Sequence, residues 1–261
     1  MSIFGKLFKA EGDVSTGNTQ INNALKILRN SGLSHQERVS GLTKLKSIFL
    51  ASSSKDDLRA IAQLILKTAS SDESTKIREM SLTTFDTIIE MGGGQKAGLV
   101  AGCAMPILKG IAESSSEDLK ELRQMAFRTI SRIAPLVIDD ELLELFAHGL
   151  SDKNTSIKIA SIRFFENNAR SADDMLKKRI AKVCLPALCE ALSDSEIWIQ
   201  VAKTLGALGH FALGAAPFLY SRLDDEEGEW AAAALREVTG KDYGRKDKEK
   251  WDEWLKKSVV K

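Results

Sequence analysis

The sequence predicts an all-α protein in which helical hairpins are stacked side by side. Three observations support this prediction. A short helical motif recurs along the chain at intervals of roughly 33–45 residues, which is typical of helical-repeat architectures. Only four prolines interrupt the 261 residues, so long segments run without helix breakers. The alternation of β-branched and polar residues that is typical of strands is scarce.

The recurring motif is a basic residue, a small residue three positions later and a large apolar residue seven positions after the first. These three positions lie on one face of a helix. The small residue lets a neighbouring helix approach closely, and the large residue fills the space beside it. Clear copies begin at Arg38, Arg78, Arg123 and Lys158, and degenerate copies begin at Trp198 and Ala231. The copies predict about six hairpins, the last two without the basic residue.

A first helix is expected before each copy of the motif. Three prolines, each followed two positions later by a leucine, are expected near the starts of such helices, where a missing N–H is tolerated: Pro106, Pro186 and Pro217. An acid stands six positions before three of the basic residues: Asp72, Glu117 and Asp152. We expect this acid to cap the second helix and to pair with the basic residue in its first turn.

Proline-x-leucine, a turn aspartate and a basic–small–large helix together resemble the HEAT-repeat family over residues 19–240. The resemblance implies an α-α superhelix, an armadillo-type α-solenoid of about six HEAT-like hairpins with one continuous core. Residues 1–18 are then an N-terminal tail. The stretch from Ala234 to Gly244, followed by Trp251 and Trp254, resembles the closing segment of many bacterial HEAT-like proteins. Residues 241–261 are therefore expected to cap the stack.

Composition narrows the class of protein further. The 37 basic and 36 acidic residues leave a formal net charge of +1, which argues against a surface that coats nucleic acid or anionic membrane as a whole. The sparse cysteines, Cys103, Cys184 and Cys189, form no disulfide framework and favour a reducing, cytoplasmic location. No apolar run is long enough to span a membrane, and no signal peptide is expected.

No convincing catalytic or metal-binding constellation is present, so we expect a protein that is not an enzyme and needs no cofactor. Some HEAT-repeat hydroxylases hold iron with paired histidine–glutamate dipeptides. The histidines of this chain, His35, His148 and His210, are not followed by glutamate. Cys184 and Cys189 have no partner at metal-ligand spacing and are expected to be buried. The glycine-rich stretch 91–98 lacks the features of a phosphate-binding loop and is expected to be a flexible connection.

One feature suggests a binding site. Five positions after the first motif residue, four successive copies carry a cation: Arg128, Arg163, Lys203 and Arg236. Arg132 lies one turn beyond Arg128, and no acid stands at the equivalent position beside the first three. In HEAT stacks the second helices line the concave side, so these residues are expected to form a strip there. The strip predicts a scaffold that binds an acidic protein or peptide; a merely solvated face is the alternative.

A second hypothesis concerns nucleic acid. Certain HEAT-like proteins are alkylpurine DNA glycosylases that use a basic cleft with tryptophans and an acid. Trp198, Asp194 and Arg163 are comparable residue types here, although their motif does not map residue by residue. The phycobilin-lyase relatives share the repeat but likewise offer no motif that maps. At the N-terminus, the apolar residues of the first nine positions share a helix side, which suits a weak membrane or partner anchor or a simple tail.

Overall fold

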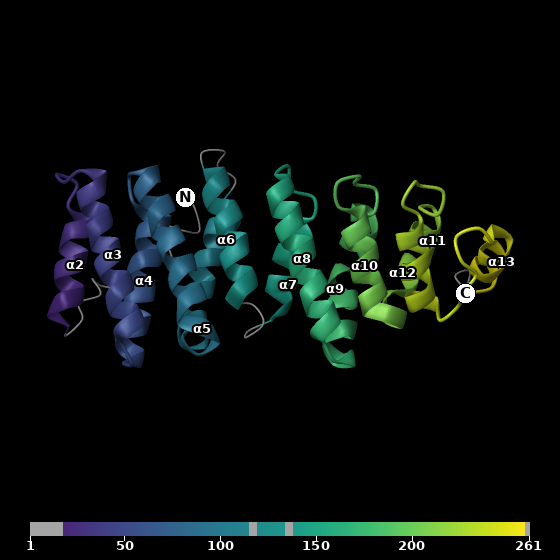
Figure 1. Cartoon of the computed structure of the whole chain (residues 1–261), viewed down its shortest axis with the longest axis horizontal. Helices are drawn as coiled ribbons and strands as arrows, with labels where there is room; N and C mark the ends of the chain where they lie inside the picture. The colour runs from purple at the N-terminus through teal and green to yellow at the C-terminus, as the bar shows by residue number, and fades with distance from the viewer. Residues whose placement is uncertain (1–17, 115–118, 134–137, 259–261) are drawn as a thin grey trace. The chain divides into compact units, whose positions relative to one another are not determined.

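The computed structural model describes residues 18–114, 119–133 and 138–258, and in these ranges it is helical without any strand (Figure 1). The predicted all-α fold class is confirmed. The chain divides into two compact units, Met1–Val137 and Ile138–Lys261, hereafter unit 1 and unit 2. The N-terminal segment proposed above as an anchor lies outside the described residues.

The described residues of unit 1 form three hairpins. Its helices are α2 (Thr19–Arg29), α3 (His35–Ala51), α4 (Lys55–Ser71), α5 (Thr75–Ala112) and α6 (Lys120–Ile133). The second helix of one hairpin packs on that of the next, as α3 does on α5 and α5 on α6. Because α5 serves both as the second helix of one hairpin and as the first helix of the next, it has to change direction on the way.

The change of direction in α5 occurs at a single residue. Gly93 has φ +69° and ψ 177°, a conformation that side chains other than glycine rarely adopt. The expectation of a flexible loop over residues 91–98 is therefore wrong. Of the consecutive glycines in this stretch, only Gly93 has a positive φ, and its neighbours continue the helices on either side. One left-handed residue is enough to end one helix and start the next.

Unit 2 continues the hairpin pattern with shorter elements. It contains α7 (Asp140–Gly149), α8 (Thr155–Ser171), α9 (Asp174–Ala191), α10 (Trp198–Leu208), the 3-10 helix η3 (Gly209–Ala215), α11 (Ala216–Tyr220), α12 (Glu229–Thr239) and α13 (Lys248–Ser258). The hairpins are α7 with α8, α9 with α10, and the η3–α11 segment with α12. The second helices form a packed series, because α10 contacts both α8 and α12.

The motif positions bury as expected. The small residues Ser81 and Ser161 are fully buried, as are the large residues Phe85 and Phe165 one turn later. A Cβ added at Gly41 would lie 2.7 Å from a backbone oxygen of α2, so only glycine allows this approach. Burying each large side chain stabilises the fold by about 1.5–3 kcal/mol.

The turn acids act differently from the expectation. The second helices α5 and α8 are capped by Ser74 and Asn154, whose side chains accept N–H groups of the first turn. Asp72 and Asp152 instead accept the N–H two residues further on, at 3.0 and 2.8 Å, and so shape the turn. Glu117 lies outside the described residues.

The ion pairs of the turn acids link neighbouring hairpins. Asp72 pairs with Arg38 of the preceding hairpin, and Asp194 pairs with Lys158 at 2.6 Å in the same way. The hydrogen bond from Lys158 also lowers the pKa of the Asp194 carboxyl below its usual range. In these two copies the basic residue of the motif therefore joins two repeats, instead of pairing only within its own turn.

The same basic residues also hold the end of the first helix. Arg38 Nε donates to the Leu28 carbonyl oxygen at 2.7 Å, and Arg78 Nε donates to that of Ala69 at 3.0 Å. Arg123 repeats this contact with the end of α5 at 3.3 Å. The carbonyl groups at a helix end have no partner within the helix, so each arginine supplies one that the helix lacks.

Later arginines replace the missing basic residues of the last two hairpins. Where the motif carries Trp198, the guanidinium of Arg222 donates to the Leu192 carbonyl oxygen and lies 5.4 Å from the Trp198 ring centre. Where it carries Ala231, Arg245 donates to carbonyl groups in the turn before α12, the shortest of these bonds being 2.5 Å. The contact is thus kept although the residue that makes it comes from further along the chain.

Two of the three prolines lie elsewhere than predicted. Pro217 does stand in the first turn of α11. Pro106 and Pro186 lie inside α5 and α9, because α9 and the part of α5 that follows Gly93 both start about three turns before the proline. A proline inside a helix removes one backbone hydrogen bond and favours a bend.

The C-terminal segment is anchored by one fully buried tryptophan. Trp251 of α13 has no exposed surface, and its Nε1 donates to the Gly244 carbonyl oxygen at 2.8 Å. Tyr243 and Trp254 meet its ring edge-to-face. This packing ties α13 to the turn before it; the boundary at residue 241 and the capping role stay predictions.

Candidate functional site

The five predicted cations all lie on second helices, at positions that face away from the core. Arg128 and Arg132 lie on α6, Arg163 on α8, Lys203 on α10 and Arg236 on α12. All are exposed except Lys203, which is half-buried. The structure therefore brings three of them together on the packed helices of unit 2, while Arg128 and Arg132 belong to unit 1.

The two arginines of unit 1 are already paired with acids. Arg128 Nη2 lies 2.8 Å from Asp86 Oδ2, and the buried Asp86 also accepts the Thr129 hydroxyl at 3.1 Å. Arg132 lies 2.9 Å from Glu90 and 3.6 Å from Asp86. Both acids come from α5, the preceding second helix. No acid follows Arg128 directly in the sequence, but an acid one helix away neutralises it.

Two cations of unit 2 have no acid beside them. Within the described part of unit 2, no carboxylate pairs with Arg163 or with Lys203. The ammonium of Lys203 lies 3.8 Å from the ring centre of Trp230, the first-turn tryptophan of α12. Such a contact is a cation–π interaction, and Trp230 remains 43% exposed beneath it. The Arg163 guanidinium and the pair of half-buried Lys203 with exposed Trp230 thus lie on neighbouring helices.

Arg236 is paired only loosely. Its guanidinium lies 3.3 Å from Glu237 and 3.9 Å from Asp242, and all three side chains are more than half exposed. Exposed ion pairs of this length contribute little, roughly 0–1 kcal/mol. A stronger ligand for the guanidinium would displace them at small cost.

Sequence reasoning missed Trp230, and the motif register explains why. The residue immediately before the motif is apolar and buried in four of the other hairpins, as Ile77, Ile157 and Ile197 show. Trp230 occupies that register but lies in the first turn of α12, where it is largely uncovered. The acids Asp86 and Glu90 were missed because nothing local to α5 indicates that they face α6.

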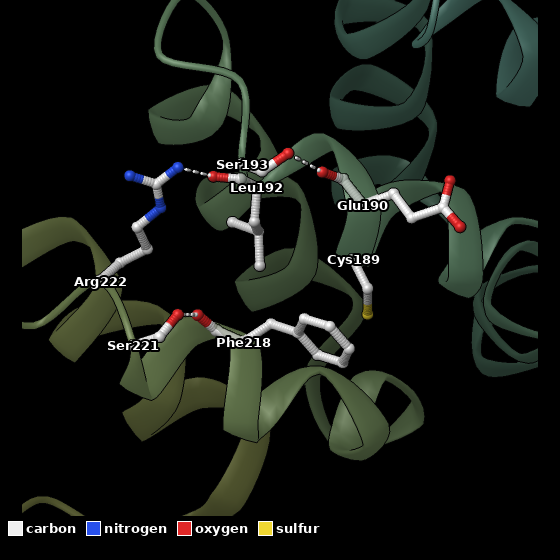
Figure 2. A pocket seen from close by; sticks show the side chains of 7 residues that line it. All are labelled: Cys189, Glu190, Leu192, Ser193, Phe218, Ser221 and Arg222. Carbon is white, nitrogen blue, oxygen red and sulfur yellow. Dashed lines mark hydrogen bonds between the residues drawn. The ribbon is translucent and has the colours of Figure 1, made fainter.

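A hollow of about 420 Å³ lies where the end of α9 meets α11 (Figure 2). Burial and the nearby Glu190 raise the pKa of the Cys189 thiol to about 11, so it stays protonated at neutral pH. The hydroxyls of Ser193 and Ser221 donate to the carbonyl oxygens of Glu190 and Phe218 (Figure 2). None of the residues that line this hollow is therefore an activated nucleophile, and the hollow is better suited to binding than to catalysis.

Burial also raises the thiol pKa of the other two cysteines, Cys103 and Cys184. Cys184 is fully buried, and its burial raises the pKa of the thiol to about 12. Burial of Cys184 and Cys189 was predicted and is confirmed.

Across the described ranges, no helix combines the length and the apolar character that crossing a membrane requires.

No family model and no curated protein sequence matches the chain. Solved structures do match. A designed armadillo repeat protein in complex with the peptide (KR)4 is 18% identical with a TM-score of 0.60, over 85% of this chain and 100% of that one. Computationally designed armadillo repeat proteins for modular peptide recognition are 18% identical with a TM-score of 0.56, over 84% of this chain and 100% of that one.

A further engineered protein is 14% identical with a TM-score of 0.58, over 85% of this chain and 98% of that one. The chain has the armadillo- and HEAT-like helical-repeat fold. The α-solenoid that the motif resemblance implied is therefore confirmed. At these identities the likeness establishes the fold, whereas partner binding at the five cations stays a prediction.

Proposed function

We propose that the protein is a non-enzymatic scaffold that binds a protein or peptide segment on the second helices of unit 2. One observation carries the proposal: Arg163 and Lys203 lie on adjacent helices, neither has an acid partner among the residues that the structure describes, and Lys203 covers an exposed Trp230. The fold supports it, since the similar designed armadillo proteins include ones made for peptide recognition. Solenoids of this kind use the surface of successive repeats for binding.

The charge of this surface favours an acidic partner. Cations on neighbouring helices stand roughly one helix diameter apart, about 10 Å, and are only partly screened at physiological salt, where the Debye length is about 8 Å. Carboxylates or phosphates of a ligand would offset that repulsion. Arginine binds either group in a two-pronged geometry, and tryptophan is frequent among the residues that dominate binding energy.

The five cations are expected to contribute unequally. Arg163, Lys203 and Arg236 are the proposed centre of the surface on unit 2. Arg128 and Arg132 of unit 1 would contribute less, because a ligand acid must compete there with Asp86 and Glu90. We also propose that the surface is the concave one, as it is in HEAT stacks.

The test uses the full chain with the double substitution Arg163→Glu and Lys203→Glu. Its matched control is Lys246→Glu with Lys256→Glu, two exposed lysines of the same unit. Proteins captured from the native host by the wild type and by the control should be lost from the first variant. Circular dichroism should be the same for all three.

Two outcomes would overturn the proposal. The first is a set of captured partners that is identical for all proteins. The second is duplex DNA binding by the wild type that falls steeply as salt rises and disappears in the Arg163→Glu, Lys203→Glu variant. That result would favour the nucleic-acid hypothesis, because release of counterions from phosphates makes such binding strongly salt-dependent.

A further inference from the structure

A second surface of unit 2 lies on its first helices, whereas Arg163, Lys203 and Arg236 lie on the second helices. Two hollows of about 420 Å³ each follow α9: one beside η3 and one at its end beside α11. We propose that this pair of hollows, the α9 groove, binds a second partner: an acidic peptide segment that carries large apolar side chains. The proposal is independent of the site on the second helices.

The first hollow combines an apolar floor with a basic rim. Leu185 and Phe211 lie on opposite walls, from α9 and η3. The two segments approach closely, since a Cβ added at Gly214 would lie 3.3 Å from Leu185 Cδ2. Lys178 and Lys182 form the exposed rim, one turn apart on the same helix face. Among the described residues, neither lysine has a carboxylate partner, and no acid lines this hollow.

The second hollow extends the apolar surface toward the end of α9. Phe218 of α11 stands over it and is 48% exposed (Figure 2). Leu192 and Cys189 form the opposite wall, and Arg222 closes the end next to the turn. Glu190 also lines this hollow, so the attraction for an acidic segment comes from the lysines of the first hollow. Each hollow therefore has one phenylalanine from the η3–α11 segment, Phe211 in the first and Phe218 in the second.

Two further exposed apolar side chains belong to the helices that line the groove. Met175 is 80% exposed and lies one turn before Lys178 on α9. Leu213, in the same 3-10 helix as Phe211, is 39% exposed. Large apolar side chains gathered at one place on a surface commonly mark an interaction site.

The length of the groove and its charge define the occupant. From Lys178 to Leu192 the helix rises about 20 Å at roughly 1.5 Å per residue. An extended peptide of about six residues, at roughly 3.3 Å each, spans that distance. Apolar side chains would enter the hollows, and acids would meet Lys178 and Lys182. Hollows suit protruding side chains, whereas a flat lipid surface would not fill them, so we favour a peptide over a membrane.

The experiment isolates this groove by using the full chain with Arg163→Glu and Lys203→Glu as the background. The probe is a fluorescein-labelled synthetic peptide in which leucine and phenylalanine alternate with pairs of glutamate. Fluorescence anisotropy should report binding to the background protein. Adding Lys178→Glu and Lys182→Glu should weaken it about tenfold or more, because two attractive charges become repulsive.

The controls separate charge, shape and folding. The double substitution Lys246→Glu and Lys256→Glu, added to the same background, should leave the affinity unchanged. A probe with lysine in place of glutamate should not bind the background protein. Replacing Phe218 by alanine should weaken binding severalfold without loss of helical circular dichroism, because the residue is half exposed.

Two results would overturn the α9 groove as a peptide site. One is the absence of probe binding to the background protein, and the other is binding that is insensitive to Lys178→Glu with Lys182→Glu. Vesicles of phosphatidylserine and phosphatidylcholine form a third arm. Co-sedimentation that depends on the two lysines, without probe binding, would assign the surface to a membrane. None of these results bears on the wild-type partners of the second-helix site.

Discussion

The last second helix of unit 1 and the second helices of unit 2 carry cations at the same register, but these cations differ in what surrounds them. In unit 1, Arg128 binds Asp86, which stands eight positions into the motif of the preceding second helix. In unit 2 the corresponding acid is Glu166 of α8. It pairs with Arg170 of its own helix at 2.6 Å and leaves Lys203 of α10 to the ring of Trp230.

This difference shows that an acid at the right register does not by itself neutralise the cation on the next helix. The short side chain of Asp86 is buried, and its carboxylate finds its partners on α6. Glu166 is longer and finds an arginine one turn along its own helix, a favourable arrangement on any helix surface. The basic surface of unit 2 therefore persists where that of unit 1 is neutralised.

The largest expected effect is on unit 1. Replacing Asp86 by alanine removes the acceptor of both Arg128 and the Thr129 hydroxyl, so the free energy of unfolding should fall by about 2–3 kcal/mol. Urea denaturation of wild type and variant measures this change. The freed arginines should also bind an acidic peptide more tightly. Unchanged stability would mean that Asp86 is not the element that distinguishes the units.

Replacing Trp230 by alanine should lower the affinity of unit 2 for its partner about tenfold, because exposed tryptophans that hold a cation often dominate binding energy. Stability should change by less than about 1 kcal/mol, since much of the ring faces solvent. Isothermal titration with the captured partner, alongside urea denaturation, separates the two effects. A large loss of stability with unchanged affinity would instead make Trp230 a structural residue.

The stabilisation by the Lys158–Asp194 ion pair, which links two hairpins of unit 2, should depend on pH. Lys158 holds the pKa of Asp194 below its usual value in the folded state, so the pair contributes stability above the unfolded pKa near 3.8. That contribution, about 1 kcal/mol, should be present at neutral pH and be lost as pH falls through the folded pKa. The Asp194→Asn variant should be less stable than wild type at pH 7, and the difference should vanish in strong acid. A constant difference would contradict this.

The smallest effect should come from Arg170→Ala. It removes an exposed pair within α8 that contributes about 0.3–0.5 kcal/mol, and it frees Glu166 to turn toward α10. We expect affinity for an acidic partner to fall about twofold, as the comparison with Asp86 implies. The control is the double variant Glu166→Gln with Arg170→Ala. It should bind the acidic partner as tightly as the wild type in the same titration.

Much of the fold could be predicted because its signals are local. The motif at Arg38 and its copies specify which helix face is buried, since residues three and seven positions apart share a face. The exposed register of Arg163 and Arg236 follows from the same rule. Gly93 shows the limit of such reasoning, because composition indicated a loop while the backbone needed only one left-handed residue.

By itself, then, the sequence determined the helical repeat, the core face of each second helix and the residues that point away from it. Only the tertiary structure decided which groups meet across hairpins: Asp72 with Arg38, Arg222 with the end of α9, and Lys203 with Trp230. The physical reason is range. Periodicity along one helix fixes a direction, but the partner in that direction depends on how the neighbouring helix is rotated and spaced, and side-chain packing between the helices sets both.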